Sequence, residues 1–124
     1  MTLQELYASI EGNYEQACRV LRIEKLIDKH IRKLPDNPIF QRLFDAADAM
    51  NPTELFESAH AIKGVCGNLG LTKMASFAST LSEEFRPGNS RRMSDDEVRS
   101  VVTDARALYE KTKNCISAYI GQAL

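Results

Sequence analysis

Residues 59–70 read Ala-His-Ala-Ile-Lys-Gly-Val-Cys-Gly-Asn-Leu-Gly and have the periodicity of the second half of an amphipathic helix. Apolar side chains recur here at steps of three and four residues, which places them on one flank of a helix. These apolar residues are Leu55, Ala59, Ile62, Cys66 and Leu69. We expect this flank to face the core, so the stretch predicts a helix that packs against other helices along one side.

The other flank of the same helix carries His60, Lys63, Gly64 and Gly67. These residues are neighbours on a helix surface because they are spaced three and four residues apart. A glycine inside a helix costs roughly 0.5–1 kcal/mol relative to alanine. Two glycines beside an exposed histidine therefore indicate that another molecule comes close to the backbone at this point.

Signals for helix starts divide the remainder of the chain. The spacing of a capping box, in which a polar residue is followed three residues later by Glu or Gln, occurs at several places. The pairs are Thr2 with Glu5, Asn13 with Gln16, Asn51 with Glu54, and Ser94 with Glu97. Together with the apolar periodicity, these signals predict helices at residues 2–10, 14–34, 38–49, 51–70, 72–86 and 95–121. Gly70 is expected to end the histidine helix as a left-handed C-cap.

The pattern predicts an all-α fold, because no segment shows alternating strand periodicity with hairpin chemistry. We expect the four longest helices, at 14–34, 51–70, 72–86 and 95–121, to form an antiparallel up-and-down four-helix bundle. The short accessory helices at 2–10 and 38–49 should lie across its end. The length of 124 residues fits a single domain that spans residues 1–124.

Composition excludes several classes of function. The net charge is -1 and no long basic run occurs, so we expect no binding to nucleic acid or to an anionic membrane. The apolar runs are too short to cross a bilayer, and the N-terminus does not have the pattern of a signal peptide. The three cysteines are unclustered, which favours reduced thiols and a cytoplasmic location and gives no zinc site.

The segment His60-Ala61-Ile62-Lys63-Gly64, followed by Asn68-Leu69-Gly70, resembles the signature of histidine-containing phosphotransfer (HPt) domains. These domains relay phosphoryl groups between aspartates of receiver domains, and their fold is a four-helix bundle with accessory helices. The resemblance implies that His60 is the phosphoacceptor and that Lys63 lies beside the phosphoryl oxygens. It also implies that Gly64 leaves room for the acidic pocket of the partner.

Two positions depart from the signature. Val65 stands where Ser or Ala is common, and Gly67 stands where Ala is common. Neither departure removes a chemical group, and we group Gly67 with Gly64 as a partner-binding position. Phe56 lies one turn before His60 on nearly the same side. It belongs either to the core or to an apolar rim for a docking partner, and the sequence leaves both interpretations open.

The other histidine, His30, is expected at the edge of the core. Its neighbours in the predicted helix are apolar. They are Ile27, Ile31 and Leu34. We therefore do not expect His30 to form a site.

Elementary chemistry is consistent with phosphoryl transfer at His60. A neutral imidazole, with an ordinary pKa of about 6.5, is a competent nucleophile at neutral pH, and an ammonium one turn away offsets the phosphoryl charge. Phosphoryl transfer also needs in-line positioning and a metal, yet the sequence has no phosphate-binding glycine loop or carboxylate cluster for magnesium. We therefore expect no cofactor in this chain and expect the magnesium on the partner receiver domain.

The expected function is that of a phosphorelay intermediate, which takes a phosphoryl group from a receiver-domain aspartate and passes it to another. The chain would act as a monomeric phosphocarrier without enzyme activity, and its partners would be response-regulator receiver domains and a hybrid histidine kinase. One alternative is a helical adaptor that binds signalling partners without phosphorylation. Another is a small hydrolase with His60 as general base, which would need an orienting acid and a pocket.

Overall fold

The computed structural model describes residues 1–122. Within this range the chain forms only helices. They are α1 (Leu3–Ser9), α2 (Tyr14–Leu21), α3 (Glu24–Lys33), the short 3-10 helix η1 (Leu34–Asp36), α4 (Ile39–Ala49), α5 (Pro52–Asn68), α6 (Thr72–Phe85) and α7 (Asp95–Gln122). The predicted all-α class is confirmed. The expected domain runs to residue 124, and its last two residues lie outside the described range.

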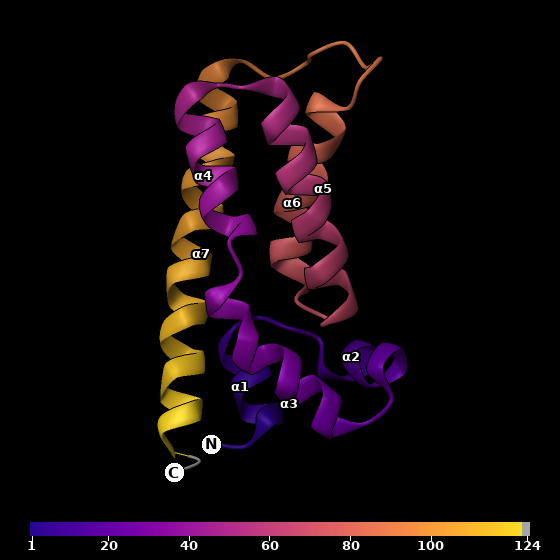
Figure 1. Ribbon diagram of the computed structural model, residues 1–124, viewed down its shortest axis with the longest axis vertical. Helices are drawn as coiled ribbons and strands as arrows, with labels where there is room; N and C mark the ends of the chain where they lie inside the picture. Colours follow the sequence, from indigo (N-terminus) through magenta and orange to yellow (C-terminus); the bar gives the residue numbers. More distant parts are fainter. Residues whose placement is uncertain (123–124) are drawn as a thin grey trace.

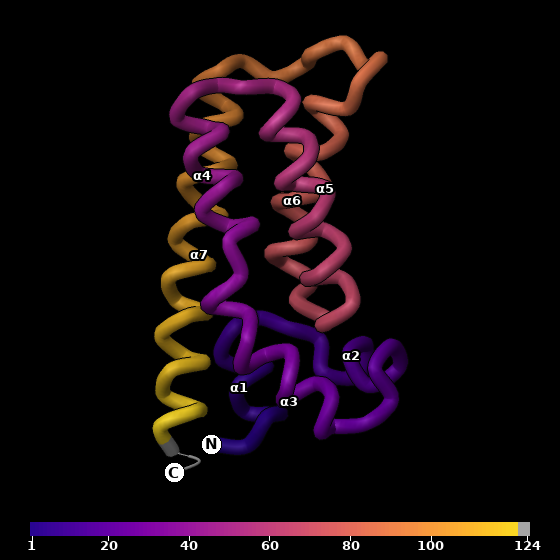
Figure 2. The backbone as a smooth tube through the Cα atoms, viewed as in Figure 1, coloured from indigo at the N-terminus to yellow at the C-terminus, as the bar shows by residue number. Residues whose placement is uncertain are grey.

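Helices α4, α5, α6 and the first half of α7 form an antiparallel four-helix bundle (Figure 1). Each helix runs opposite to the one before it, and α5 packs against both α4 and α6. The remaining helices, α1 to α3, gather at one end of the bundle beside the second half of α7, as the backbone trace shows (Figure 2). Helix α5, which carries the histidine motif, is thus held between two neighbours and has one flank free.

The predicted choice of bundle helices was wrong for two segments, because residues 14–34 lie at one end of the bundle and residues 38–49 take the fourth place in it. The segment 38–49 does not lie across the end of the bundle but forms α4, one of its four members. Its aromatic side chains explain this position, because Phe40 stacks on Tyr109 of α7 with ring centroids 4.3 Å apart and Phe44 packs beside the same ring. This aromatic packing holds α4 against α7.

The predicted continuous helix at 14–34 was also wrong, because the chain breaks at Arg22, which has a φ of 68°. The break separates α2 from α3 and lets each helix bury its own residues, Ala17 in α2 and Ile27 in α3. On a single helix the apolar residues of 14–34 would form one broad stripe, but two of them, Val20 and Ile23, are exposed in the structure. The stripe was too broad for one helix to bury, and neither glycine nor proline marks the break.

Two of the four predicted capping boxes are complete, those at Thr2 with Glu5 and Ser94 with Glu97. In the other two the asparagine caps the helix, but the partner side chain is used for tertiary contacts. Gln16 donates a hydrogen bond to the carbonyl oxygen of Gly67 at 3.0 Å, which joins α2 to α5. Glu54 forms an ion pair with Arg42, which joins α5 to α4.

Gly70 ends α5 as predicted, with a φ of 70°. The amide of Leu71 donates to the carbonyl oxygen of Cys66 at 2.8 Å, and the amide of Gly70 donates to that of Gly67 at 3.2 Å. These two bonds form a Schellman motif and satisfy carbonyls at the helix end. The carbonyl of Gly70 also accepts a bond of 2.7 Å from the amide of Asn13, which holds the start of α2 against the end of α5.

Candidate functional site

The outward flank of α5 carries His60, Lys63 and Gly64, and all three are exposed. The opposite flank is fully buried. Its residues are Leu55, Ala59, Ile62 and Cys66. The two flanks therefore lie as the periodicity of the sequence predicts, and the imidazole of His60 is accessible to a second molecule from outside the bundle.

The glycines of this flank have no packing role within the described residues. A Cβ atom added at Gly64 or at Gly67 would meet no other atom within 4 Å. Gly67 is half-buried because its carbonyl oxygen accepts the hydrogen bond from Gln16, whereas Gly64 is open to solvent. The interpretation that these glycines permit close helix packing thus has no support in the structure. Their effect is to leave the backbone beside His60 uncovered by side chains.

Phe56 and Arg86 form a column of stacked groups with His60. The rings of Phe56 and His60 are nearly parallel, with centroids 5.6 Å apart and planes at 20°. The guanidinium of Arg86, which follows the last residue of α6, lies over the ring of Phe56 at 5.5 Å from its centroid. Phe56 is half-buried and packs against the core, so it joins the core to the side chain of His60.

Arg86 is held in place by Glu83, one turn earlier in α6. The Nε and Nη2 atoms of Arg86 donate to Oε1 of Glu83 at 3.2 and 2.8 Å. The pKa of Glu83 lies below its usual range, chiefly because of this hydrogen bond and the charge of Arg86. The charge of Lys63 lowers this pKa further by a smaller amount.

This arrangement presents a nucleophile next to positive charge. The cationic groups are the exposed Lys63 ammonium, one turn after His60 on α5, and the Arg86 guanidinium over Phe56, which pairs with Glu83. An incoming phosphoryl group carries negative charge, which such cations stabilise. Within the described residues His60 makes no hydrogen bond or ion pair, so no carboxylate orients the imidazole as a general base would require.

The described residues contain no group of three or more His, Cys, Asp or Glu side chains that could hold a metal ion. In the same part of the chain, no helix is long and apolar enough to cross a membrane.

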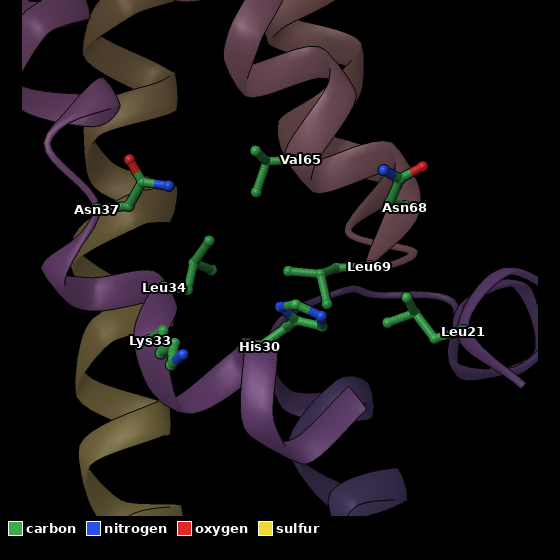
Figure 3. Close-up of a pocket in the computed structure, with 8 residues that line it drawn as sticks. All are labelled: Leu21, His30, Lys33, Leu34, Asn37, Val65, Asn68 and Leu69. Atoms are coloured by element: carbon green, nitrogen blue, oxygen red, sulfur yellow. The ribbon is translucent and has the colours of Figure 1, made fainter. Parts of the chain in front are cut away.

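A pocket of about 300 Å³ lies at the C-terminal end of α5, and His60 is not among its lining residues (Figure 3). Its lining residues come from α2, α3, η1, the link to α4, and the end of α5. They are Leu21, His30, Lys33, Leu34, Asn37, Val65, Asn68 and Leu69. His30 is exposed and lines this pocket beside the buried core residues Leu34 and Leu69. The break at Arg22 sets the direction of α3 independently of α2, and His30 consequently faces the pocket.

Sequence reasoning missed the contact of Arg86 with Phe56 and the pairing of Arg86 with Glu83. Spacing within one helix brings together residues three and four apart, but it does not show which residues of α6 face α5. Arg86 also stands at the very end of the helix predicted at 72–86, where the sequence gives no direction for its side chain. The one available signal was the Glu83–Arg86 spacing, which is typical of an exposed ion pair and does not by itself indicate a site.

Comparison with protein families matches residues 22–115 to the Hpt domain. The chain belongs to the Hpt domain family. The matched segment contains the whole of α4, α5 and α6 and most of α7, and therefore the histidine helix with both of its bundle neighbours. Comparisons with curated proteins and with solved structures gave no match.

Membership confirms the resemblance drawn from the signature on α5. An Hpt domain implies histidine phosphotransfer in a phosphorelay, with receiver domains as the interacting proteins. The family is one of phosphocarriers, and no enzyme family is indicated for this chain.

Proposed function

We propose that this Hpt domain accepts a phosphoryl group on His60 from the aspartyl phosphate of one receiver domain and passes it to the aspartate of another. The observation that carries the proposal is the exposed imidazole of His60 on the free flank of a mid-bundle helix, beside Lys63 and the bare backbone of Gly64. The hydrogen bond from Tyr7 of α1 to the carbonyl oxygen of Leu69 ties α1 to the end of the helix that carries His60.

In the proposed step the lone pair of a His60 ring nitrogen attacks the phosphorus atom in line with the bond to the aspartyl oxygen. A phosphorus–nitrogen bond forms, the phosphorus–oxygen bond breaks, and the aspartate leaves as a carboxylate. The reverse step delivers the group to the next receiver. The magnesium ion that neutralises charge in such transfers would come with the receiver domain.

Incubation with a receiver domain that carries a labelled aspartyl phosphate tests this function. We expect a label on the chain that is labile in acid and stable in base, as a phosphorus–nitrogen bond on histidine is. A chain that binds the receiver but acquires no label would be a helical adaptor. Rapid release of inorganic phosphate without a labelled intermediate would favour the hydrolase. Either result would overturn the proposal.

Replacement of Lys63 by alanine should slow transfer without preventing receiver binding. One exposed cation near the phosphoryl group is worth about 0.5–1 kcal/mol, so the rate should fall by roughly twofold to fivefold. Rapid-quench measurement of transfer at saturating receiver gives the rate. Lys73→Ala is the matched control, because Lys73 is an exposed lysine of α6 that pairs with Glu11. A wild-type rate in Lys63→Ala would remove Lys63 from the site.

Replacement of Gly64 by glutamine should raise the stability of the protein and lower the rate of phosphoryl transfer. The new side chain meets no atom of the chain at its Cβ, so the helix should gain roughly 0.5–1 kcal/mol because glycine is a poor helix former. The same side chain would obstruct a receiver at His60. In-line attack requires the reacting atoms to come within about 3–3.5 Å, so we expect transfer to fall by about tenfold or more.

Thermal melting and receiver transfer are to be measured on the same Gly64→Gln preparation. Gly121→Gln is the matched control, because Gly121 is a helical glycine of α7 whose added Cβ also meets nothing. A small donor such as acetyl phosphate should be hindered less than a receiver domain. A lower melting temperature with normal transfer per folded molecule would contradict this account of Gly64.

A further inference from the structure

The stack of Phe56 on His60 limits the freedom of an otherwise exposed side chain. Residues four apart on a helix are neighbours, and the nearly parallel rings at 5.6 Å form an offset stack, which is a preferred geometry for such pairs. An exposed imidazole without such a contact would exchange among several rotamers. Phe56 is half-buried and packs against the core, so the core anchors one side of the ring on which the imidazole stacks.

Stacking on a ring face leaves the nucleophile free. The lone pair of an imidazole nitrogen lies in the plane of the ring and points away from its edge. A neighbour that covers a face of the ring therefore fixes the direction of attack without blocking it. In-line transfer depends on this direction, because the attacking and leaving atoms must be aligned at phosphorus.

Arg86 in turn limits the movement of the Phe56 ring. Its guanidinium lies over the Phe56 ring at 5.5 Å, within the range of a cation–π contact, and its two hydrogen bonds to Glu83 fix the plane of the guanidinium. The column thus spans two helices and links the end of α6 to the nucleophile on α5. No other guanidinium or ammonium group within the described residues lies over Phe56.

We infer that Phe56 and Arg86 are positioning residues, which orient the imidazole of His60 for phosphoryl transfer through the stacked column. The inference rests on the proposed function of His60 and adds two residues to it. It also gives a role to Phe56, which the sequence alone leaves as either a core residue or part of a docking rim. In a docking rim, Phe56 would contribute to receiver affinity, whereas a positioning residue contributes to the rate within the complex.

The first test uses the unphosphorylated protein, so that it does not depend on transfer. In a proton–carbon NMR spectrum the ring signals of His60 should be displaced from random-coil positions by the ring current of Phe56. The chain has two histidines, so His60→Gln assigns the signals directly. In Phe56→Leu the displacement should disappear, and in Arg86→Gln it should shrink as Phe56 becomes mobile. Phe56→Tyr should retain it.

The second test separates the maximal rate of transfer from the receiver concentration that gives half of it. For Phe56→Leu we expect the maximal rate to fall by about threefold to tenfold, with little change in the half-saturating concentration. Arg86→Gln should lower the maximal rate by a smaller factor, and Phe56→Tyr should keep the maximal rate of the wild type. Arg99→Gln is the control, since Arg99 also pairs with an acidic residue three positions away, Asp96, but lies over no ring.

The outcomes distinguish this inference from the proposed function. If the wild-type chain takes no label at His60, the proposed function fails, while the NMR displacement still reports whether the column orders the ring. If the wild type is labelled but Phe56→Leu transfers at the wild-type maximal rate, the positioning role is refuted. A raised half-saturating concentration with an unchanged maximal rate would assign Phe56 to a docking rim instead.

Discussion

Replacing His60 by glutamine is expected to abolish phosphoryl acceptance while leaving the fold intact. Glutamine has similar reach and polarity, but its amide nitrogen is not a nucleophile, so no phosphorus–nitrogen bond can form. The side chain is exposed, and substitutions at such positions usually change stability by less than about 0.5 kcal/mol. Incubation with a phosphorylated receiver followed by detection of the acid-labile label measures the first effect, and a thermal melt measures the second.

His30 supplies an unusually close control for this experiment. It is also exposed and also has a lysine three residues later, Lys33. It differs in the next position, where the buried side chain of Leu34 stands in place of the bare backbone of Gly64. His30→Gln should therefore transfer as the wild type does. A label that survives in His60→Gln and vanishes in His30→Gln would place the phosphoacceptor on α3.

The orientation of α5 was predictable because the sequence of this one helix is enough to show which of its flanks is buried. Apolar residues at helical spacing fix the buried flank, and the exposed flank then follows from geometry alone. The end of the helix was predictable for a similar reason, since Gly70 adopts a conformation that few other residues tolerate. Both inferences use contacts between residues close in sequence.

The errors arose where contacts between distant residues decide the structure. The break at Arg22 occurs without glycine or proline, and Val20 and Ile23 fit a buried stripe equally well. The place of α4 in the bundle depends on Phe40 and Tyr109, which are far apart in the sequence. The same holds for Arg86 above Phe56. No spacing rule predicts which side chains of one helix reach another.

Two glycines of the same motif illustrate the difference between a functional and a structural requirement. Gly64 has open space where a side chain would begin, so the fold does not need a glycine there. At Gly70 a Cβ atom would lie 2.2 Å from the carbonyl oxygen of Asn13 and 3.1 Å from the amide nitrogen of Ala17. Both of these are backbone atoms at the start of α2, which cannot move aside as a flexible side chain can.

Gly70→Ala is therefore expected to destabilise the protein by roughly 2–4 kcal/mol, which combines the strain of a left-handed alanine with the displacement of α2. The bond from Asn13 to the Gly70 carbonyl at 2.7 Å should weaken, and so should the bond from Tyr7 to the neighbouring Leu69 carbonyl at 2.6 Å. Urea unfolding followed by circular dichroism measures the loss, and hydrogen exchange should rise first at the start of α2.

Gly64→Ala is the matched comparison and should raise the free energy of unfolding by roughly 0.5–1 kcal/mol, because only helix propensity changes. Gly70→Asn separates the two causes of this destabilisation, which are the strain of a left-handed backbone and the displacement of α2. Asparagine tolerates a left-handed backbone better than alanine does, but it carries the same Cβ atom toward Asn13. We expect it to recover only a small part of the lost stability. Near-wild-type stability in Gly70→Asn would mean that the approach of α2 imposes no steric limit, and that backbone conformation alone requires the glycine.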